Sequence, residues 1–353
     1  MRVLLVNSSV TMRGGESQTL ELGLRLRGRG IETAFAVRAG SELDAAIPAG
    51  PGTLKVRFET PVFSTPLQIR RFIKDWRPDI VHAQTSKAHA HALFACRGLA
   101  PLVVSRRTAF GGGRGLASIL KYGKGVAHYI PISEAAARSL RSRGVPDGKM
   151  TVVPSGIEIE RFSSVVRARI AGEIPVAGMA AAFEKEKGHS VLLDAAAMLE
   201  SRGIRMRYLR AGRGRLEERI VAGASKRGID LEIRRIGDDL PLERFLGMLD
   251  IYILPSIEEG LSTGLMAAMA SGLPCVASRT GGIPEVTGEE AALLVEPGDA
   301  AGLAEAIGNL AGDPSVRDLY SSRGAERALL FDVEKMVDGT LGVYERVHER
   351  ERD

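Results

Sequence analysis

A glutamate placed directly before a run of small residues is the feature of this sequence that most clearly suggests chemistry. Glu259 and Gly260 follow the apolar run Ile251–Leu254, which has the length and composition of a buried strand. Strong helix formers then predict a helix over 265–270. The loop between strand and helix contains Leu261, Ser262, Thr263 and Gly264. A helix that begins at such a loop exposes backbone N–H groups, and these groups bind anions such as phosphate.

The carboxylate of Glu259 is unusual beside a predicted phosphate site, because the two negative charges repel each other. The arrangement is useful if the carboxylate accepts hydrogen bonds from a neutral group attached to the phosphate, such as a sugar hydroxyl. Ser262 or Thr263 is expected to cap the helix. The stretch therefore favours a ligand in which a phosphate carries a neutral group.

Other parts of the sequence offer positive charge or an approachable backbone. Lys187 stands in a loop between a predicted strand and a predicted helix. Near the start of the chain, Gly14 and Gly15 lie in a loop between a predicted strand at 3–6 and a predicted helix at 17–27. This loop can hold a phosphate, although it lacks the G-x-G-x-x-G spacing of a nucleotide-binding fingerprint.

A histidine and two arginines follow two predicted strands of the first half. His82 ends the strand predicted at 79–82, and Arg106 and Arg107 follow the strand predicted at 102–105. Ligands of parallel sheets bind at the carboxyl ends of the strands. We expect the two arginines to bind an anion there. His82 is either a buried core histidine or a general base.

The charge of the chain is divided unequally. Residues 1–150 contain 23 Lys and Arg against 10 Asp and Glu, whereas the remaining residues contain 25 against 33. A basic first half favours an anionic partner such as a membrane surface, nucleic acid or an acidic glycolipid, unless the whole sequence is simply rich in arginine. Aromatic residues make up only 5% of the chain, which argues against binding single-stranded nucleic acid.

The length of 353 residues is enough for two domains. Alternating strands and helices predict parallel sheets in an α/β fold. The predicted boundaries give a first domain over 1–165, a second over 166–335 and a final helix over 336–353. No apolar run is long enough to cross a membrane, and the first residues indicate a strand rather than a signal peptide. The distant Cys96 and Cys275 suggest a reduced, cytoplasmic protein.

The residues from Glu259 onward resemble the signature of retaining GT-B glycosyltransferases of the family 4 type. The resemblance rests on the order E-G, A-M-A, G-L-P and G-G-I-P-E between 259 and 285. It implies two Rossmann-like domains facing across a cleft, with a last helix that returns to the first domain. The segment 105–110, with Lys121 and Tyr122, resembles enzymes that build bacterial surface polysaccharides and lipopolysaccharide.

The resemblance also assigns roles to residues. Lys187 and the amides of the loop after Glu259 are expected to neutralise the diphosphate of a nucleotide-sugar, while Glu259 orients the sugar. Arg107 lies where relatives commonly have a histidine beside the transferred sugar, so the expected catalytic residues are Glu259, Lys187 and Arg107. The expected donor-binding residues are Gly14, Gly15, Lys187, Gly212, Glu259, Gly260, Leu261, Ser262, Thr263 and Gly264. The expected acceptor-side residues are His82, Arg106 and Arg107.

Two positions depart from the family pattern. Ala267 replaces a second glutamate that bonds the nucleotide ribose, and Ala182 replaces an arginine that binds the diphosphate. Each lost charge-assisted hydrogen bond costs roughly 1.5–3 kcal/mol, which weakens binding without abolishing it. Lys185 is a candidate substitute for the missing arginine.

We therefore expect a glycosyltransferase that retains the anomeric configuration. It uses a UDP-, GDP- or ADP-sugar, acts on a glycolipid or polysaccharide acceptor, and needs neither metal nor other cofactor; the pair Asp238 and Asp239 is interpreted as a solvated loop. A cytoplasmic location with peripheral contact to an anionic membrane is expected, and no nucleic-acid partner. The alternatives are a catalytically impaired scaffold, or an epimerase or hydrolase with His82 as base.

Overall fold

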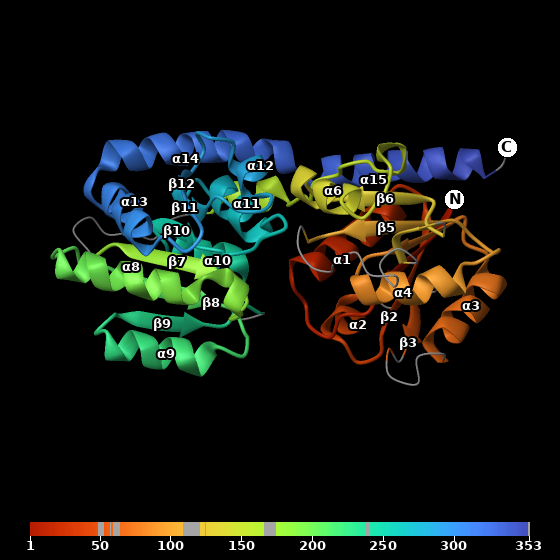
Figure 1. Cartoon of the computed structure of the whole chain (residues 1–353), viewed down its shortest axis with the longest axis horizontal. Helices are drawn as coiled ribbons and strands as arrows, with labels where there is room; N and C mark the ends of the chain where they lie inside the picture. Colours follow the sequence, from red (N-terminus) through yellow and green to blue (C-terminus); the bar gives the residue numbers. More distant parts are fainter. Residues whose placement is uncertain are drawn as a thin grey trace. The chain divides into compact units, whose positions relative to one another are not determined.

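The computed structural model places two compact units along the chain (Figure 1). The structure describes residues 1–48, 53–56, 58, 64–108, 121–123, 125–165, 174–237 and 240–351. Unit 1 comprises Met1–Gly156 and Val333–Asp353, and unit 2 comprises Ile157–Asp332. Each unit contains a six-stranded parallel sheet covered by helices, which is the α/β architecture expected from the alternating pattern.

The sheet of unit 1 has the strand order β3-β2-β1-β4-β5-β6. Its strands are β1 (Arg2–Asn7), β2 (Glu32–Arg38), β3 (Thr53–Val56), β4 (Ile80–Ala83), β5 (Leu102–Arg106) and β6 (His128–Pro131). The central strands are continuous apolar runs because helices cover both faces of the sheet. The short strand β3 at the edge was not predicted.

The helices of unit 1 form two layers around this sheet (Figure 1). They are α1 (Gly14–Gly28), α2 (Glu42–Ala46), α3 (Ser64–Trp76), α4 (Ser86–Ala95), α6 (Glu134–Arg141) and α15 (Val333–Arg350), with a 3₁₀ turn η1 (Asp147–Lys149). Val337 and Tyr344 of α15 are buried in the same core as Leu26 of α1 and Leu5 of β1. The last helix thus completes the core of unit 1, as expected.

The sheet of unit 2 has the order β12-β11-β10-β7-β8-β9. Its strands are β7 (Val176–Ala180), β8 (Arg207–Ala211), β9 (Leu231–Arg234), β10 (Ile251–Leu254), β11 (Cys275–Ser278) and β12 (Leu293–Val295). Strands β7 and β10 are neighbours in the middle of the sheet. Their carboxyl ends therefore bring the loops after Ala180 and Leu254 together.

The helices of unit 2 cover both faces of its sheet. They are α7 (Ile159–Ser163), α8 (His189–Ser201), α9 (Glu217–Lys226), α10 (Leu242–Gly247), α11 (Thr263–Ala270), α12 (Ile283–Thr287), α13 (Ala300–Gly312) and α14 (Pro314–Ala328), with 3₁₀ turns η2 (Lys185–Lys187) and η3 (Leu329–Phe331). Leu192 of α8 and Ile307 of α13 share one buried core with Ile253 of β10. Helices α8 and α13 thus hold the sheet from one side.

The observed unit boundaries lie at 156/157 and 332/333, whereas the sequence placed them after 165 and after 335. Helix α7 packs against α11 and so belongs to unit 2. At the other boundary, Val333 is already buried in the core of unit 1. Both boundaries therefore fall a few residues earlier because the flanking side chains already pack in the next unit.

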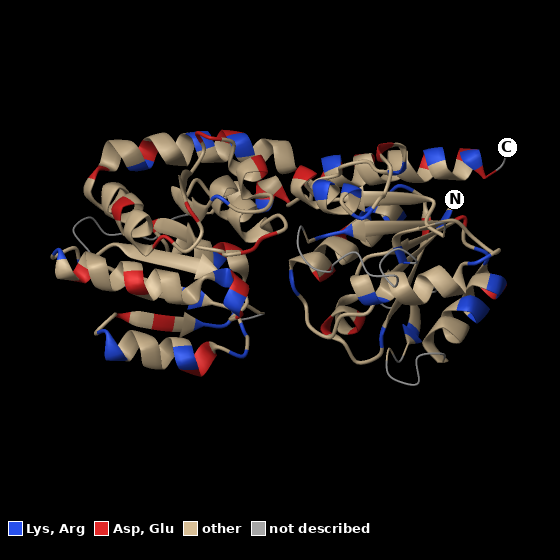
Figure 2. Cartoon of the chain, in the orientation of Figure 1, with Lys and Arg blue, Asp and Glu red and all other residues tan. Residues whose placement is uncertain are grey.

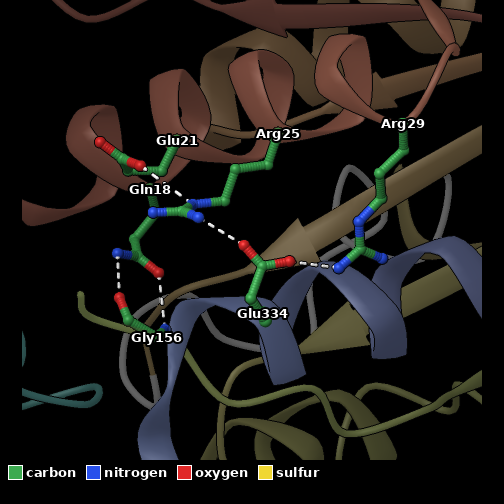
Figure 3. Close-up of polar contacts among 6 residues, drawn as sticks. All are labelled: Gln18, Glu21, Arg25, Arg29, Gly156 and Glu334. Atoms are coloured by element: carbon green, nitrogen blue, oxygen red, sulfur yellow. Dashed lines mark hydrogen bonds and ion pairs between the residues drawn. The ribbon is translucent and has the colours of Figure 1, made fainter. Parts of the chain in front are cut away.

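Helix α1 holds both places where the chain passes between the units (Figure 3). Gln18 accepts a hydrogen bond from the amide of Gly156 at 2.8 Å and donates to its carbonyl at 2.6 Å. Arg25 and Arg29 both form ion pairs with Glu334, in the first turn of α15. The buried side-chain amide of Gln18 thus holds the chain where it leaves unit 1, and the guanidinium groups of Arg25 and Arg29 hold it where it returns.

Candidate functional site

The centre of the candidate site in unit 2 is an ion pair between Lys187 and Glu259. Lys187 Nζ lies 2.6 Å from Glu259 Oε2, and the two side chains are 21% and 10% exposed. The hydroxyl of Ser256 donates to the same Oε2 at 3.2 Å. Within the described residues, Oε1 accepts no hydrogen bond and is the oxygen that remains for a ligand.

Close contacts between backbone segments hold this pair in place. The amides of Ile257 and Glu258 both donate to the carbonyl of Glu186, at 2.8 and 3.2 Å. Gly188 has a φ of +65°, and a Cβ there would lie 1.7 Å from the carbonyl oxygen of Pro255. Only glycine fits at this position, because a side chain would push the Lys187 loop away from the Glu259 loop.

Gly281 allows a third segment to approach Glu259 from the β11 side. Its φ is +55°, and a Cβ at Gly281 would lie 1.7 Å from the carbonyl oxygen of Glu259. The backbone of Glu259 is therefore in direct contact with the loop after β11, which leaves it little freedom to move.

The N-terminus of α11 lies in the same region. Ser262 is the N-cap, and its hydroxyl accepts a hydrogen bond from the amide of Leu265 at 3.2 Å. Thr263 and Gly264 form the start of the helix, where backbone amides have no acceptor within the helix. A Cβ at Gly264 would lie 2.8 Å from the Tyr252 hydroxyl, so a small residue is needed there.

Gly212 joins this group from the end of β8. Its φ is +154°, and a Cβ would lie 2.0 Å from the carbonyl oxygen of Ala181. The structure thus brings to one edge of one sheet the residues expected to bind the donor in unit 2: Lys187, Gly212, Glu259, Gly260, Leu261, Ser262, Thr263 and Gly264.

The two alanines that depart from the family pattern lie in this region as well. Ala267 is completely buried within α11. Ala182 is partly buried, and its carbonyl accepts a hydrogen bond from His189 Nε2 at 2.9 Å. Lys185, the candidate substitute for the missing arginine, is exposed on the turn η2.

In unit 1, His82 is enclosed in a hydrogen-bond network. Its Nδ1 lies 2.5 Å from the hydroxyl of Tyr344 and 2.9 Å from Nε2 of Gln84, and its Nε2 lies 2.8 Å from Ser105 Oγ. Burial, followed by the nearby charge of Arg107, lowers the pKa of His82 to about 3. The ring is therefore neutral near pH 7, and it ties β4, β5 and α15 together.

Arg107 and the Gly14–Gly15 pair lie together in unit 1, although the sequence assigned them to opposite sides of the reaction. Arg107 donates to Gln84 Oε1 at 2.7 Å. A Cβ at Gly15 would lie 3.2 Å from Arg107 Cδ. Burial lowers the pKa of Arg107 to about 10, with the charge of Glu16 opposing the shift, so the guanidinium remains charged at neutral pH.

Arg106 has surroundings of its own. It ends β5, and its Nη1 donates to the hydroxyl of Tyr122 at 3.3 Å. Consecutive residues of an extended segment point to opposite faces, and Arg107 accordingly contacts other residues. Burial lowers the pKa of Arg106. The two arginines therefore have different surroundings, which the interpretation of the pair in the sequence did not take into account.

Several residues of these networks carried no clear sequence signal. Arg210 is completely buried within β8, where it contacts His189, and Tyr344 reaches His82 from the last helix. The only sequence signal for Arg210 was its place in a predicted strand, where its neighbours are apolar. The contact of Tyr344 joins residues far apart in the chain, so no local pattern could reveal it.

Two of the features discussed in the sequence lie outside the described residues: positions 109 and 110 of the segment 105–110, and the pair Asp238 and Asp239. Among the described residues, no group of three or more His, Cys, Asp or Glu side chains is arranged to hold a metal ion.

Comparison with known proteins places the chain in a family. Residues 12–161 match the domain described as Glycosyltransferase Family 4, and residues 174–313 match the domain described as Glycosyl transferases group 1. These two regions make up most of both units. The chain belongs to the GT-B glycosyltransferases of the family 4 type.

Individual relatives agree with this assignment. The chain is 32% identical over 184 residues to the amylovoran biosynthesis glycosyltransferase AmsK of Erwinia amylovora, an alignment that covers 50% of this chain and 45% of that protein. It is 27% identical over 362 residues to the phosphatidyl-myo-inositol mannosyltransferase of Mycobacterium leprae (strain TN), which covers 95% and 93%. The chain covers 36–56% of the length of the curated relatives that it matches at 30% identity or more.

Among solved structures, Anabaena Alr3699/HepE in complex with UDP-glucose has a TM-score of 0.83 to this chain, covering 97% of this chain and 100% of that one. The sequence identity is 17%, so this likeness shows the fold alone. The two six-stranded parallel sheets are those of the GT-B fold.

Proposed function

We propose that this protein is a glycosyltransferase that moves a sugar from a nucleotide-sugar to a glycolipid or polysaccharide acceptor. The observation that carries the proposal is the Lys187–Glu259 pair beside the N-terminus of α11. This arrangement places a cation, free backbone amides and a carboxylate oxygen at one edge of the unit 2 sheet. A sugar attached to a diphosphate has complementary groups for all three.

In this proposal, Lys187 and the first amides of α11 stabilise the leaving diphosphate. Charge develops on the leaving group as the glycosidic bond breaks, and fixed donors that face this charge lower the barrier. An ammonium group has three N–H donors, so Lys187 can bond a phosphate oxygen while it keeps its contact with Glu259. Glu259 Oε1 accepts hydrogen bonds from sugar hydroxyls and thereby orients the anomeric carbon.

We further propose that transfer retains the anomeric configuration, with the acceptor hydroxyl attacking on the face that the diphosphate leaves. The basis is membership of family 4, together with the absence of an evident carboxylate nucleophile from the sequence. Proton NMR of the product, with a donor of known configuration, tests this point directly. A product of opposite configuration contradicts it.

A reaction without a divalent metal is also part of the proposal. Lys187 and the helix N-terminus provide positive charge where the diphosphate is expected, which is the role that Mg²⁺ plays in other nucleotide enzymes. Transfer that continues unchanged in excess EDTA is the expected result. Activity that disappears with EDTA and returns with Mg²⁺ or Mn²⁺ contradicts this part.

The acceptor is proposed to lie at an anionic membrane surface, on the inner face of the plasma membrane. Figure 2 shows basic positions on α3 of unit 1. Arg71 and Lys74 are exposed there, and Leu67, one helical turn before Arg71, is 53% exposed. No helix among the described residues is long and apolar enough to cross a membrane. Equal binding to anionic and neutral vesicles contradicts the membrane contact.

A second candidate function is a scaffold that binds the nucleotide-sugar without turnover. The completely buried Ala267 favours it, because the methyl side chain of this alanine cannot bond a ribose. The epimerase or hydrolase alternative relied on His82 as a base. We do not propose it, because both ring nitrogens of His82 are engaged and the ring is buried.

The decisive experiment is a ligand panel followed by a transfer assay. Thermal shift with UDP, GDP, ADP and their sugar conjugates identifies the donor, since a ligand at 100 times its Kd adds about 2.7 kcal/mol of stability. Glu259→Ala should bind the free nucleotide normally and the sugar conjugate more weakly. Glu258→Ala is the matched control, because Glu258 is the exposed neighbour. Binding without transfer to any lipid or polysaccharide acceptor would support the scaffold.

A further inference from the structure

Unit 2 contains a completely buried arginine that has no acidic partner among the described residues. Arg210 lies in β8 with 1% of its surface exposed, and its Nη2 contacts Met179 Sδ and His189 Nδ1. Its Nε and Nη1 have no hydrogen-bond partner, and among the described residues no carboxylate is in ion-pair contact with it. A buried charge in this situation is costly, because it is removed from bulk water and no described carboxylate pairs with it.

Arg210 lies near the carboxyl end of β8, at the edge of the sheet that carries the candidate donor site. It is paired in the sheet with Met179, one residue before the end of β7, and Gly212 follows two residues later. The Tyr252 hydroxyl is close enough to both Arg210 and Glu259 that their charges shift its pKa in opposite directions. The same hydroxyl faces Gly264 at the N-terminus of α11.

A short chain of hydrogen bonds connects Arg210 to the position where the family pattern has its arginine. Arg210 donates to His189 Nδ1, and His189 Nε2 donates to the carbonyl of Ala182. This order of donors fixes the neutral tautomer of the imidazole, and burial lowers the pKa of His189 to about 3. The chain therefore holds the loop that runs from Ala182 to Lys187.

We propose that Arg210 supplies, from β8, the positive charge for the donor's diphosphate that Ala182 does not supply from the loop. Arg210 acts as a positioning residue: its charge adds to that of Lys187, and His189 transmits its position to the Lys187 loop. The inference rests on the proposed function, because it assumes that a diphosphate binds beside Lys187 and α11.

In this proposal, the free-energy cost of burying the charge of Arg210 is offset when the diphosphate binds. Burial lowers the pKa of Arg210 to about 9, so the guanidinium is still protonated at pH 7. Without a ligand the charge destabilises unit 2. A bound diphosphate compensates it, so the residue is useful for binding although it is unfavourable for the stability of the free protein.

The experiment compares Arg210→Met, Arg210→Lys and wild type by isothermal titration with pyrophosphate, and with whichever of UDP, GDP or ADP binds wild type. Arg210→Met keeps the approximate volume and removes the charge. We expect it to weaken diphosphate binding by about tenfold or more, and to weaken the matching nucleoside monophosphate clearly less. Arg210→Lys should restore much of the affinity. Arg207→Met is the matched control, because Arg207 is an exposed arginine at the other end of β8.

Urea unfolding of the free proteins gives the second readout. Arg210→Met should be as stable as wild type or more stable, which a residue with a purely structural role would not show. Unchanged affinity of Arg210→Met for pyrophosphate and for the nucleoside diphosphate overturns the proposal for Arg210 alone. A wild type that binds no diphosphate overturns the proposed donor site as well. If Arg210→Met does not fold, Arg210→Gln provides the neutral variant, and the same comparison decides.

Discussion

Removing either charge of the Lys187–Glu259 pair should reveal how strongly the two loops depend on each other. The atoms Nζ and Oε2 lie 2.6 Å apart, with side chains 21% and 10% exposed. Such a pair falls between a surface ion pair, worth about 0–1 kcal/mol, and a buried pair, whose disruption costs about 3–5 kcal/mol. We therefore expect a coupling free energy of about 1–3 kcal/mol between the two residues.

A double-mutant cycle with Lys187→Met, Glu259→Gln and the double variant measures this coupling. Urea unfolding gives the free energy of each protein without ligand and with a saturating nucleoside diphosphate. The coupling should decrease when the diphosphate is bound, because Lys187 then shares its donors with phosphate oxygens. Lys226→Met, at an exposed lysine in the last turn of α9, is the control. A coupling below about 0.5 kcal/mol in the free protein would refute the reasoning, since that is the error of additivity for independent sites.

Three other predictions follow from the close contacts and the buried histidines. Gly281→Ala should weaken nucleotide binding and lower the free energy of unfolding by at least about 2 kcal/mol, because the new Cβ would lie 1.7 Å from the carbonyl oxygen of Glu259. Gly298→Ala is the control: Gly298 has a φ of +85° but no atom within 4 Å of the new Cβ, so the substitution should cost only about 1 kcal/mol. Tyr344→Phe should cost about 1–3 kcal/mol in urea unfolding by removing the hydroxyl that bonds Nδ1 of His82, and a loss within error contradicts the network. The pKa of His82 is about 3 in the folded protein, whereas its ordinary value is 6.5. The free energy of unfolding is therefore at its full value above pH 6.5 and decreases as the pH falls toward 3, because the unfolded chain takes up the proton first. Because His189 has a similarly lowered pKa, the contribution of His82 is the difference between wild type and His82→Gln, and it should be about 2 kcal/mol between pH 7 and pH 5.

The strand, loop and helix around Glu259 could be predicted because each has a strong local signal. Apolar residues are continuous from Ile251 to Leu254, Ser262 is a good N-cap, and small residues permit the close contacts at the loop. The structure has these elements at the expected positions. Local sequence was sufficient here since the site in unit 2 is built mainly from one continuous stretch.

The surroundings of individual side chains were less predictable. Side chains alternate in direction along an extended chain, and this separates Arg106 at the end of β5 from Arg107 directly after it; the interpretation of the pair overlooked this effect. By contrast, the contacts of Arg210 with His189 and of Tyr344 with His82 depend on which strands and helices become neighbours. Such contacts are decided by the tertiary fold, which the residue pattern of one element does not specify.

The attachment of both chain crossings to α1 has a consequence for synthesis and folding. Unit 1 is built from the two ends of the chain, and Val337 and Tyr344 of α15 fill part of its core. During translation the apolar face of α1 around Leu26 therefore cannot pack against α15 until all of unit 2 has been synthesised. Unit 2 is continuous and can fold first. Until α15 arrives, nascent unit 1 exposes a hydrophobic surface, and in that interval the protein depends most on chaperones.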